Sequence, residues 1–143
     1  MLDKIGRRRV EVISLARRLL FTPYIWGGNS PFIGFDCSGY IVYLYQAIGI
    51  LPLNGDWTAA ALGETFGNME TLAPQAGGIV TYKNDRGHVS HIMLILNPEL
   101  CIGAAGGGRW ATTPDISKSR HAYVKILPID YRPPYKFLDP LYS

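Results

Sequence analysis

The sequence predicts one α+β domain, in which helices come first along the chain and antiparallel strands follow. In the first half apolar residues recur at helical spacing, and in the second half short apolar runs are separated by Gly, Pro and Asn turns. A length of 143 residues is enough to bury one hydrophobic core. Apolar residues make up 48% and charged residues 17% of the chain, a balance typical of a globular protein.

A first helix is expected from about Arg7 to Leu20, and Thr22-Pro23 ends it. Five apolar residues fall on one face of this helix: Val12, Ile13, Ala16, Leu19 and Leu20. The segment lacks the uninterrupted apolar stretch and the cleavage site of a secretory signal. We therefore expect synthesis and folding in the cytoplasm without a signal peptide. No apolar run reaches the roughly 20 residues that a membrane span needs.

The central stretch is a glycine-rich loop that runs into the start of a second helix. It reads Tyr24-Ile25-Trp26-Gly27-Gly28 and, after a short interval, Phe35-Asp36-Cys37-Ser38-Gly39-Tyr40. Asp36 is a favourable N-cap, and the apolar spacing then continues to a stop at Gly49. Cys37 is thus placed in the first turn, where unpaired N–H groups and the helix dipole favour a thiolate. A buried structural cysteine is the alternative, although the small neighbouring side chains leave the sulfur approachable.

The second half is expected to contain a short helix at residues 58–66 and then four strands. These strands are predicted at residues 77–82, 89–96, 100–104 and 121–127, with a glycine-rich loop at 106–108 and an irregular stretch to residue 115. Residues 1–130 would form the domain. Residues 131–143 hold three prolines among aromatic residues, which predicts an extended arm without regular structure that lies on the domain or on a partner.

A cysteine nucleophile needs a base that takes the thiol proton and later returns it to the leaving amine. His91 lies inside the 89–96 strand, predicted on the same face as Val89 and Met93, and either satisfies a buried hydrogen bond or faces a site. His88 is predicted on the opposite face, towards solvent. His121 begins the last strand, and the sequence does not place it relative to the site.

Other classes of function find little support in the composition. The net charge is +3, and the arginines near the N-terminus are read as a solvated helix face. Basic and aromatic residues are not interleaved as in nucleic-acid-binding proteins. Two cysteines, Cys37 and Cys101, form neither a disulfide framework nor a metal cluster, and the histidines do not suggest a zinc site. We therefore expect no metal, no cofactor and no nucleic-acid partner.

Three motifs together resemble the NlpC-type cell-wall peptidases, which are papain-like cysteine peptidases. They are Tyr-x-Trp-Gly-Gly, Asp-Cys-Ser-Gly and a Ser-His pair before an apolar strand, and the resemblance runs from about residue 19 to residue 108. It implies a papain-like fold, with N-terminal helices packed on a central antiparallel sheet, and no cofactor. The implied substrates are the stem peptides of bacterial peptidoglycan, typically cut between D-glutamate and a diamino acid.

The resemblance also implies roles for individual residues. Cys37 would be the nucleophile, His91 the base, and Tyr24 would place its hydroxyl near the nucleophile. Asp36, Ser38 and Trp26 would line the substrate groove, where Asp36 is either a ligand for a free amine of the peptide or simply the N-cap.

One departure from the family concerns the group that orients the histidine. The family usually has a third polar residue about a dozen positions further on, and counting from His91 reaches Gly103. Losing such a residue can cost on the order of 10⁴-fold in rate, but less if a backbone carbonyl or a water replaces it.

The same Cys–His pair could also serve an amidase or an acyl transferase.

A different class of function therefore stays open. The alternative is a weakly active or inactive structural or wall-binding module of a phage tail or other delivery assembly, docked through the 131–143 arm. The two hypotheses are compatible, because a hydrolase carried on a phage tail would be virion-associated, act at the cell wall and need no signal peptide.

Overall fold

Six antiparallel strands form the main sheet of the computed structural model, which describes residues 2–142. In spatial order they are β3 (Glu70–Thr71), β8 (Tyr135–Leu138), β4 (Ile79–Lys83), β5 (Val89–Ile95), β6 (Leu100–Ala105) and β7 (Tyr123–Pro128). A separate two-stranded sheet pairs β1 (Asn29–Ser30) with β2 (Gly34–Phe35). The predicted α+β architecture is confirmed.

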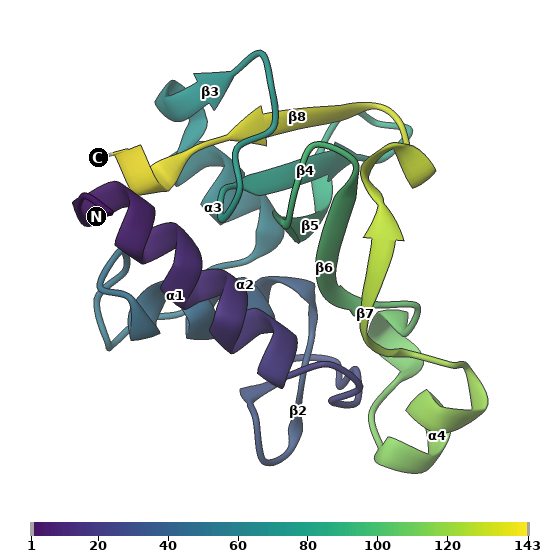
Figure 1. Ribbon diagram of the computed structural model, residues 1–143. Helices are drawn as coiled ribbons and strands as arrows, with labels where there is room; N and C mark the ends of the chain where they lie inside the picture. The colour runs from purple at the N-terminus through teal and green to yellow at the C-terminus, as the bar shows by residue number, and fades with distance from the viewer. Residues whose placement is uncertain (1, 143) are drawn as a thin grey trace.

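The helices lie mainly on one side of this sheet, with α1 and α2 together (Figure 1). They are α1 (Lys4–Arg18), α2 (Cys37–Ala47), α3 (Ala59–Thr65) and α4 (Pro114–Ser119), with 3₁₀ turns η1 (Gly67–Met69), η2 (Gly108–Trp110), η3 (Ile129–Tyr131) and η4 (Pro140–Tyr142). Helix α1 begins before the expected Arg7 because the Asp3 side chain caps it, accepting from the Gly6 N–H at 2.8 Å. In the described residues, no helix is both long and apolar enough to cross a membrane.

Helix α2 is the central element of the core, as its sequence pattern predicts. Most of its side chains are buried, and it packs against β5, β6 and α1. Two buried tyrosine hydroxyls on this helix find backbone acceptors: Tyr40 donates to the Ala16 carbonyl at 2.9 Å and Tyr45 to the Gly77 carbonyl at 2.8 Å. Because these bonds satisfy buried polar groups, they fix α2 relative to α1 and the start of β4.

The prediction that residues 131–143 lack regular structure is wrong for β8. This strand pairs with β3 on one side and β4 on the other, so it is an interior strand of the sheet. The prolines precede and follow β8 rather than interrupting it, which leaves its N–H groups free to pair. Just after it, Asp139 forms a two-point ion pair with Arg9 of α1, with nitrogen–oxygen distances of 2.8 and 3.1 Å.

Helix α4 was not expected either, because the sequence predicts an irregular stretch to residue 115 and no element between it and the strand that starts at residue 121. Thr113 caps this helix by accepting from the Ile116 N–H at 3.3 Å, and Pro114 occupies the first turn, where its missing N–H costs nothing. The other predicted helices and strands are found within a few residues of their expected bounds.

Candidate active site

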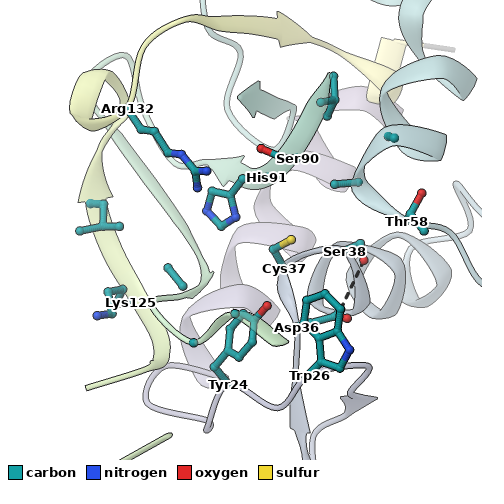
Figure 2. Close-up of a pocket in the computed structure, with 18 of the residues that line it drawn as sticks. Tyr24, Trp26, Asp36, Cys37, Ser38, Thr58, Ser90, His91, Lys125 and Arg132 are labelled. Atoms are coloured by element: carbon teal, nitrogen blue, oxygen red, sulfur yellow. Dashed lines mark hydrogen bonds between the residues drawn. The ribbon is translucent and has the colours of Figure 1, made fainter. Parts of the chain in front are cut away.

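One pocket of about 860 Å³ brings together all six residues singled out from the sequence (Figure 2). They are Tyr24, Trp26, Asp36, Cys37, Ser38 and His91. The start of α2 supplies the cysteine, and β5 supplies the histidine. The pocket also has lining residues that the sequence analysis did not select, notably Lys125, Tyr131 and Arg132.

Cys37 is the first residue of α2 and is partly buried. Backbone N–H groups of Cys37, Ser38 and Ile92 lie near its sulfur and favour the thiolate. Burial outweighs them and, together with the negative charge of Asp36, raises the pKa of the Cys37 thiol to about 11. The expectation of a lowered pKa for Cys37 is therefore wrong, because desolvation of the thiolate outweighs the effect of the helix start.

Asp36 joins the glycine-rich loop to the helix. Its Oδ1 accepts from the Gly39 N–H at 2.7 Å and from the Ser38 hydroxyl at 3.3 Å, and its Oδ2 accepts from the Gly27 N–H at 3.0 Å. Burial raises the pKa of this carboxyl despite these bonds. The predicted N-cap is confirmed, and both carboxylate oxygens are already engaged within the protein.

The glycines of the two motifs allow the loop and the helix to touch. A Cβ at Gly39 would collide with the backbone carbonyl of Gly28, and the Gly28 carbonyl in turn accepts from the Asp36 N–H at 3.0 Å. Any larger residue at position 39 would push the helix start away from the loop. Glycine is thus required at position 39 so that the loop and helix backbones can pack closely beside the nucleophile.

Tyr24 lies on the opposite side of Cys37 from His91, with its ring against the 106–108 loop (Figure 2). A Cβ at Gly107 would run into that ring, so this loop needs glycine to close over Tyr24. Burial, aided by nearby Cys37 and Asp36, raises the pKa of the Tyr24 hydroxyl, while a backbone hydrogen bond with Gly108 acts in the opposite direction. The hydroxyl therefore stays protonated and can donate a hydrogen bond.

His91 is 6% exposed and lies beside two aromatic rings. Its ring centroid is 5.6 Å from that of Tyr82 and 6.4 Å from that of Tyr131, which meets it at 87°. Its Nε2 atom is buried and has no hydrogen-bond partner among the residues that the structure describes. Burial, with a smaller contribution from the Arg132 charge, lowers the pKa of His91 to about 4. The imidazole is therefore neutral at physiological pH.

A break in the strand register separates His91 from its neighbour Val89. Tyr82 pairs with His91, but the next residue, Lys83, pairs with Val89, so β5 carries one extra residue there. Val89 consequently packs against the core that contains α2 and α3, whereas Met93 belongs to the cluster that contains Tyr82. The prediction that Val89 and His91 share a face is wrong for this reason.

The sheet register shows how Gly103 and its neighbours lie relative to His91. Leu94 pairs with Ile102, and continuing this antiparallel register sets Met93 opposite Gly103 and His91 opposite Ala105. A Cβ at Gly103 would lie 2.5 Å from the Met93 sulfur, whereas Ala105 lines the pocket with His91. Ala105 thus lies directly opposite His91 and Gly103 lies diagonal to it, so neither position offers a polar side chain to the imidazole.

The other histidines lie apart from this centre. His88 is exposed, as predicted, and the exposed His121 does not line the pocket. Across residues 2–142, no group of three or more His, Cys, Asp or Glu side chains is placed to hold a metal ion.

A thiol at the start of a buried helix, an imidazole on the facing sheet and a protonated tyrosine between loops define the site of a papain-like cysteine hydrolase. The sequence profile of the NlpC/P60 family matches residues 21–126. The chain belongs to the NlpC/P60 family, a family of peptidoglycan endopeptidases, as the motifs around Cys37 predict.

Two curated relatives come from Bacillus subtilis (strain 168). A γ-D-glutamyl-L-lysine dipeptidyl-peptidase is 31% identical over 113 residues, covering 76% of this chain and 33% of the relative. A γ-DL-glutamyl hydrolase is 32% identical over 130 residues, covering 85% of this chain and 26% of the relative. The chain thus spans about a third or less of the length of these relatives.

Solved structures agree with the fold. The NlpC/p60 domain of the peptidoglycan hydrolase SagA superposes with a TM-score of 0.66 at 24% identity, covering 92% of this chain and 97% of that one. NlpC1 from Trichomonas vaginalis gives a TM-score of 0.71 at 19% identity, covering 96% and 45% of the two chains. These similarities place the helices and the sheet in the NlpC/P60 arrangement.

Proposed function

We propose that this protein is a cysteine endopeptidase that cuts peptidoglycan stem peptides at the bond between γ-D-glutamate and a diamino acid. The observation that carries the proposal is the convergence of Cys37 and His91 in one pocket, with hydrogen-bond donors beside the sulfur. The name of one relative, a γ-D-glutamyl-L-lysine dipeptidyl-peptidase, supports the choice of bond, and that of another, a γ-DL-glutamyl hydrolase, supports a γ-glutamyl substrate. No cofactor takes part in the proposed reaction.

Before the attack the reacting pair is neutral. With a pKa of about 11 for Cys37 and about 4 for His91, the thiol keeps its proton near pH 7 and the imidazole has none. His91 therefore acts as a general base during the attack, rather than as the partner of a preformed thiolate. The Cys37 sulfur bonds to the carbonyl carbon while its proton moves to the imidazole.

The carbonyl electron pair then rests on oxygen, where N–H groups at the start of α2 and the Tyr24 hydroxyl stabilise the oxyanion. His91 gives its proton to the amide nitrogen, the carbon–nitrogen bond breaks and the amine leaves. Water attacks the remaining thioester while His91 takes a water proton. The thiol is regenerated, and the acyl fragment leaves as a carboxylic acid.

Residues on the Tyr24 side of the pocket would hold the acyl fragment. Trp26 is 55% exposed and offers an indole surface next to the nucleophile. The Asp36 carboxylate accepts hydrogen bonds from Ser38 and Gly39 at the helix start and from Gly27 in the loop. A peptide amine would therefore bind Asp36 only by sharing an oxygen that already accepts a hydrogen bond. We therefore assign Asp36 mainly to holding the nucleophile in place.

Mass spectrometry of purified sacculi, after incubation with the protein or with Cys37→Ala, tests the proposal. We expect new peptide ends at the γ-D-glutamyl bond that are absent with the variant. If the wild-type protein produces no Cys37-dependent ends on sacculi of several wall chemistries, the proposed activity is wrong.

One observation favours a second candidate function. His91 Nε2 has no partner among the described residues, as would suit an inactive wall-binding module of a phage tail or another delivery assembly. Docking through the C-terminal arm is less suited to that role, because both edges of β8 are already paired. Binding of Cys37→Ala to sacculi, without cleavage by the wild-type protein, would support this candidate.

A further inference from the structure

The wall of the pocket next to His91 includes a residue from outside the part of the chain that matches the family. Arg132 follows η3, whereas the family match ends at residue 126. Figure 2 shows its side chain approaching His91 from the side away from Cys37. On β7, Lys125 lines the same pocket.

We propose that Arg132 binds the side-chain carboxylate of the residue that leaves as the amine. This subsite would select a diamino diacid, such as diaminopimelate, over lysine. The inference rests on the proposed function, which it deepens by naming the class of the leaving-side residue.

The position of Arg132 relative to Cys37 and His91 determines which fragment of the substrate Arg132 contacts. His91 must pass its proton to the amine that leaves, so the imidazole faces the leaving fragment. Arg132 lies beyond this imidazole as seen from the sulfur (Figure 2). A group that extends from the leaving amine past His91 therefore reaches the guanidinium.

Among residues 2–142, no carboxylate forms an ion pair with either cation. The ion pairs found within residues 2–142 lie elsewhere, namely Arg9–Asp139 and Lys136–Glu70. Lys125 donates to the His121 carbonyl at 2.7 Å and lies 4.6 Å from the Tyr123 ring centroid. Arg132 is exposed, and its side chain interacts with the Tyr131 hydroxyl. Both cations therefore keep their charge available to a ligand.

The single acid that lines the described pocket does not offset this charge. Asp36 belongs to the Cys37 side and accepts from Gly27, Gly39 and Ser38. The pocket is thus acidic beside the nucleophile, at Asp36, and basic beyond the histidine, at Arg132. A guanidinium presents paired donors that match a carboxylate, whereas a second ammonium from lysine would be repelled.

A bound carboxylate would also act on the base. The Arg132 charge contributes to the low pKa of His91, and an anion on the guanidinium would offset that contribution. The diacid substrate would then meet an imidazole that accepts the thiol proton more readily. Lysine in the same place would leave the Arg132 charge uncompensated.

Three matched peptides test the subsite: L-Ala-γ-D-Glu followed by meso-diaminopimelate, by its side-chain monoamide, or by L-lysine. We expect the wild-type protein to favour the diacid over the monoamide by about tenfold in kcat/KM, in line with a charged hydrogen bond. Arg132→Gln should remove this preference and Arg132→Lys should retain part of it. Arg86→Gln, which removes an arginine outside the pocket, should leave it unchanged.

Binding to Cys37→Ala gives a readout that does not need turnover. Isothermal titration should show the diacid peptide binding about tenfold tighter than the monoamide, with the difference lost in Cys37→Ala/Arg132→Gln. Equal Kd values for the two peptides, or a preference that survives Arg132→Gln, would overturn the inference even if cleavage occurs. Absence of cleavage with the binding preference intact would instead count against the proposed function alone.

Discussion

The two halves of the pocket are built in different ways. Around Cys37, Asp36 accepts three hydrogen bonds and the glycines bring loop and helix backbones into contact. Around His91, the Nε2 atom has no hydrogen-bond partner among the described residues, and β6 places only the methyl group of Ala105 directly opposite. The rings of Tyr82 and Tyr131 pack beside the imidazole. The nucleophile is held by hydrogen bonds, and the base by packing.

The residues that hold Cys37 are close to it in sequence, whereas several residues around His91 are distant from it. The groups that hold Cys37 lie within about fifteen residues of it in sequence, whereas Tyr131 and Arg132 lie about forty residues after His91. Short-range hydrogen bonds form with the helix itself, but the walls around His91 exist only once the sheet and η3 have assembled. We therefore expect substitutions near Cys37 to cause larger losses than substitutions near His91.

The largest effect is expected from Gly39→Ala. The added methyl group collides with the Gly28 carbonyl, so the start of α2 must move and Cys37 with it. We expect activity to fall by about 100-fold or more and the free energy of unfolding to fall by about 3 kcal/mol. Peptide hydrolysis and urea unfolding measure the two losses.

Gly67→Ala is the matched control, because a Cβ at Gly67 would meet nothing within 4 Å. If Gly39→Ala behaves like this control, the close contact between loop and helix does not matter for the nucleophile.

The pH dependence of stability should report the buried imidazole. Because burial lowers the pKa of His91 from 6.5 to about 4, the unfolded chain binds this proton more readily than the folded one. Stability should therefore decline as the pH falls from 6.5 to 4, by on the order of 3 kcal/mol, and this contribution should not change further below pH 4.

Urea unfolding of the wild-type protein and His91→Gln across that pH range isolates the contribution. The variant should lack most of the decline. Equal slopes for both proteins would show that His91 is not held neutral by burial.

A smaller effect, but in the favourable direction, is expected from Ala105→Asn. A side-chain amide opposite His91 could accept from its Nε2 and fix the ring, which should raise kcat by roughly tenfold. Gly103→Asn should instead collide with Met93 and cost about 2 kcal/mol of stability without raising kcat. The pH–rate profiles of both variants distinguish them, and a gain in Gly103→Asn alone would contradict the register.

The smallest effect is expected from Tyr131→Phe, which keeps the ring that meets His91 at 87°. Loss of the hydroxyl should change kcat/KM by less than about threefold, because the ring contact is the larger part of this interaction. Tyr131→Ala removes the contact and should cost about 1 kcal/mol in transition-state stabilisation. A larger loss in the Phe variant than in the Ala variant would point to a role for the hydroxyl itself.

The same contrast decides what the sequence could predict. The helix start, its Asp36 cap and the pairing of Cys37 with His91 in one pocket follow from local spacing and from the family motifs. Counting along the chain reached Gly103, whereas the register of the hairpin between β5 and β6, which sequence distance does not fix, sets Ala105 directly opposite His91.

Other features missed by the sequence depend on distant partners or on burial. The prolines of the C-terminal segment indicated irregular structure, so β8 was not predicted. This strand forms because it pairs with β3 and β4, which are distant in sequence. The pKa of Cys37 was predicted in the wrong direction because the helix start is visible in the sequence and the depth of the sulfur is not.

The central claim is that Cys37 attacks the peptide with His91 as its base, and an acid-quenched reaction followed by mass spectrometry of the intact protein tests it most directly. During turnover of the diaminopimelate peptide, we predict an adduct on Cys37 with the mass of the L-Ala-γ-D-Glu acyl group. His91→Gln should form this adduct far more slowly, and Cys37→Ala should not form it. Turnover without any adduct, and unaffected by Cys37→Ala, would contradict the account.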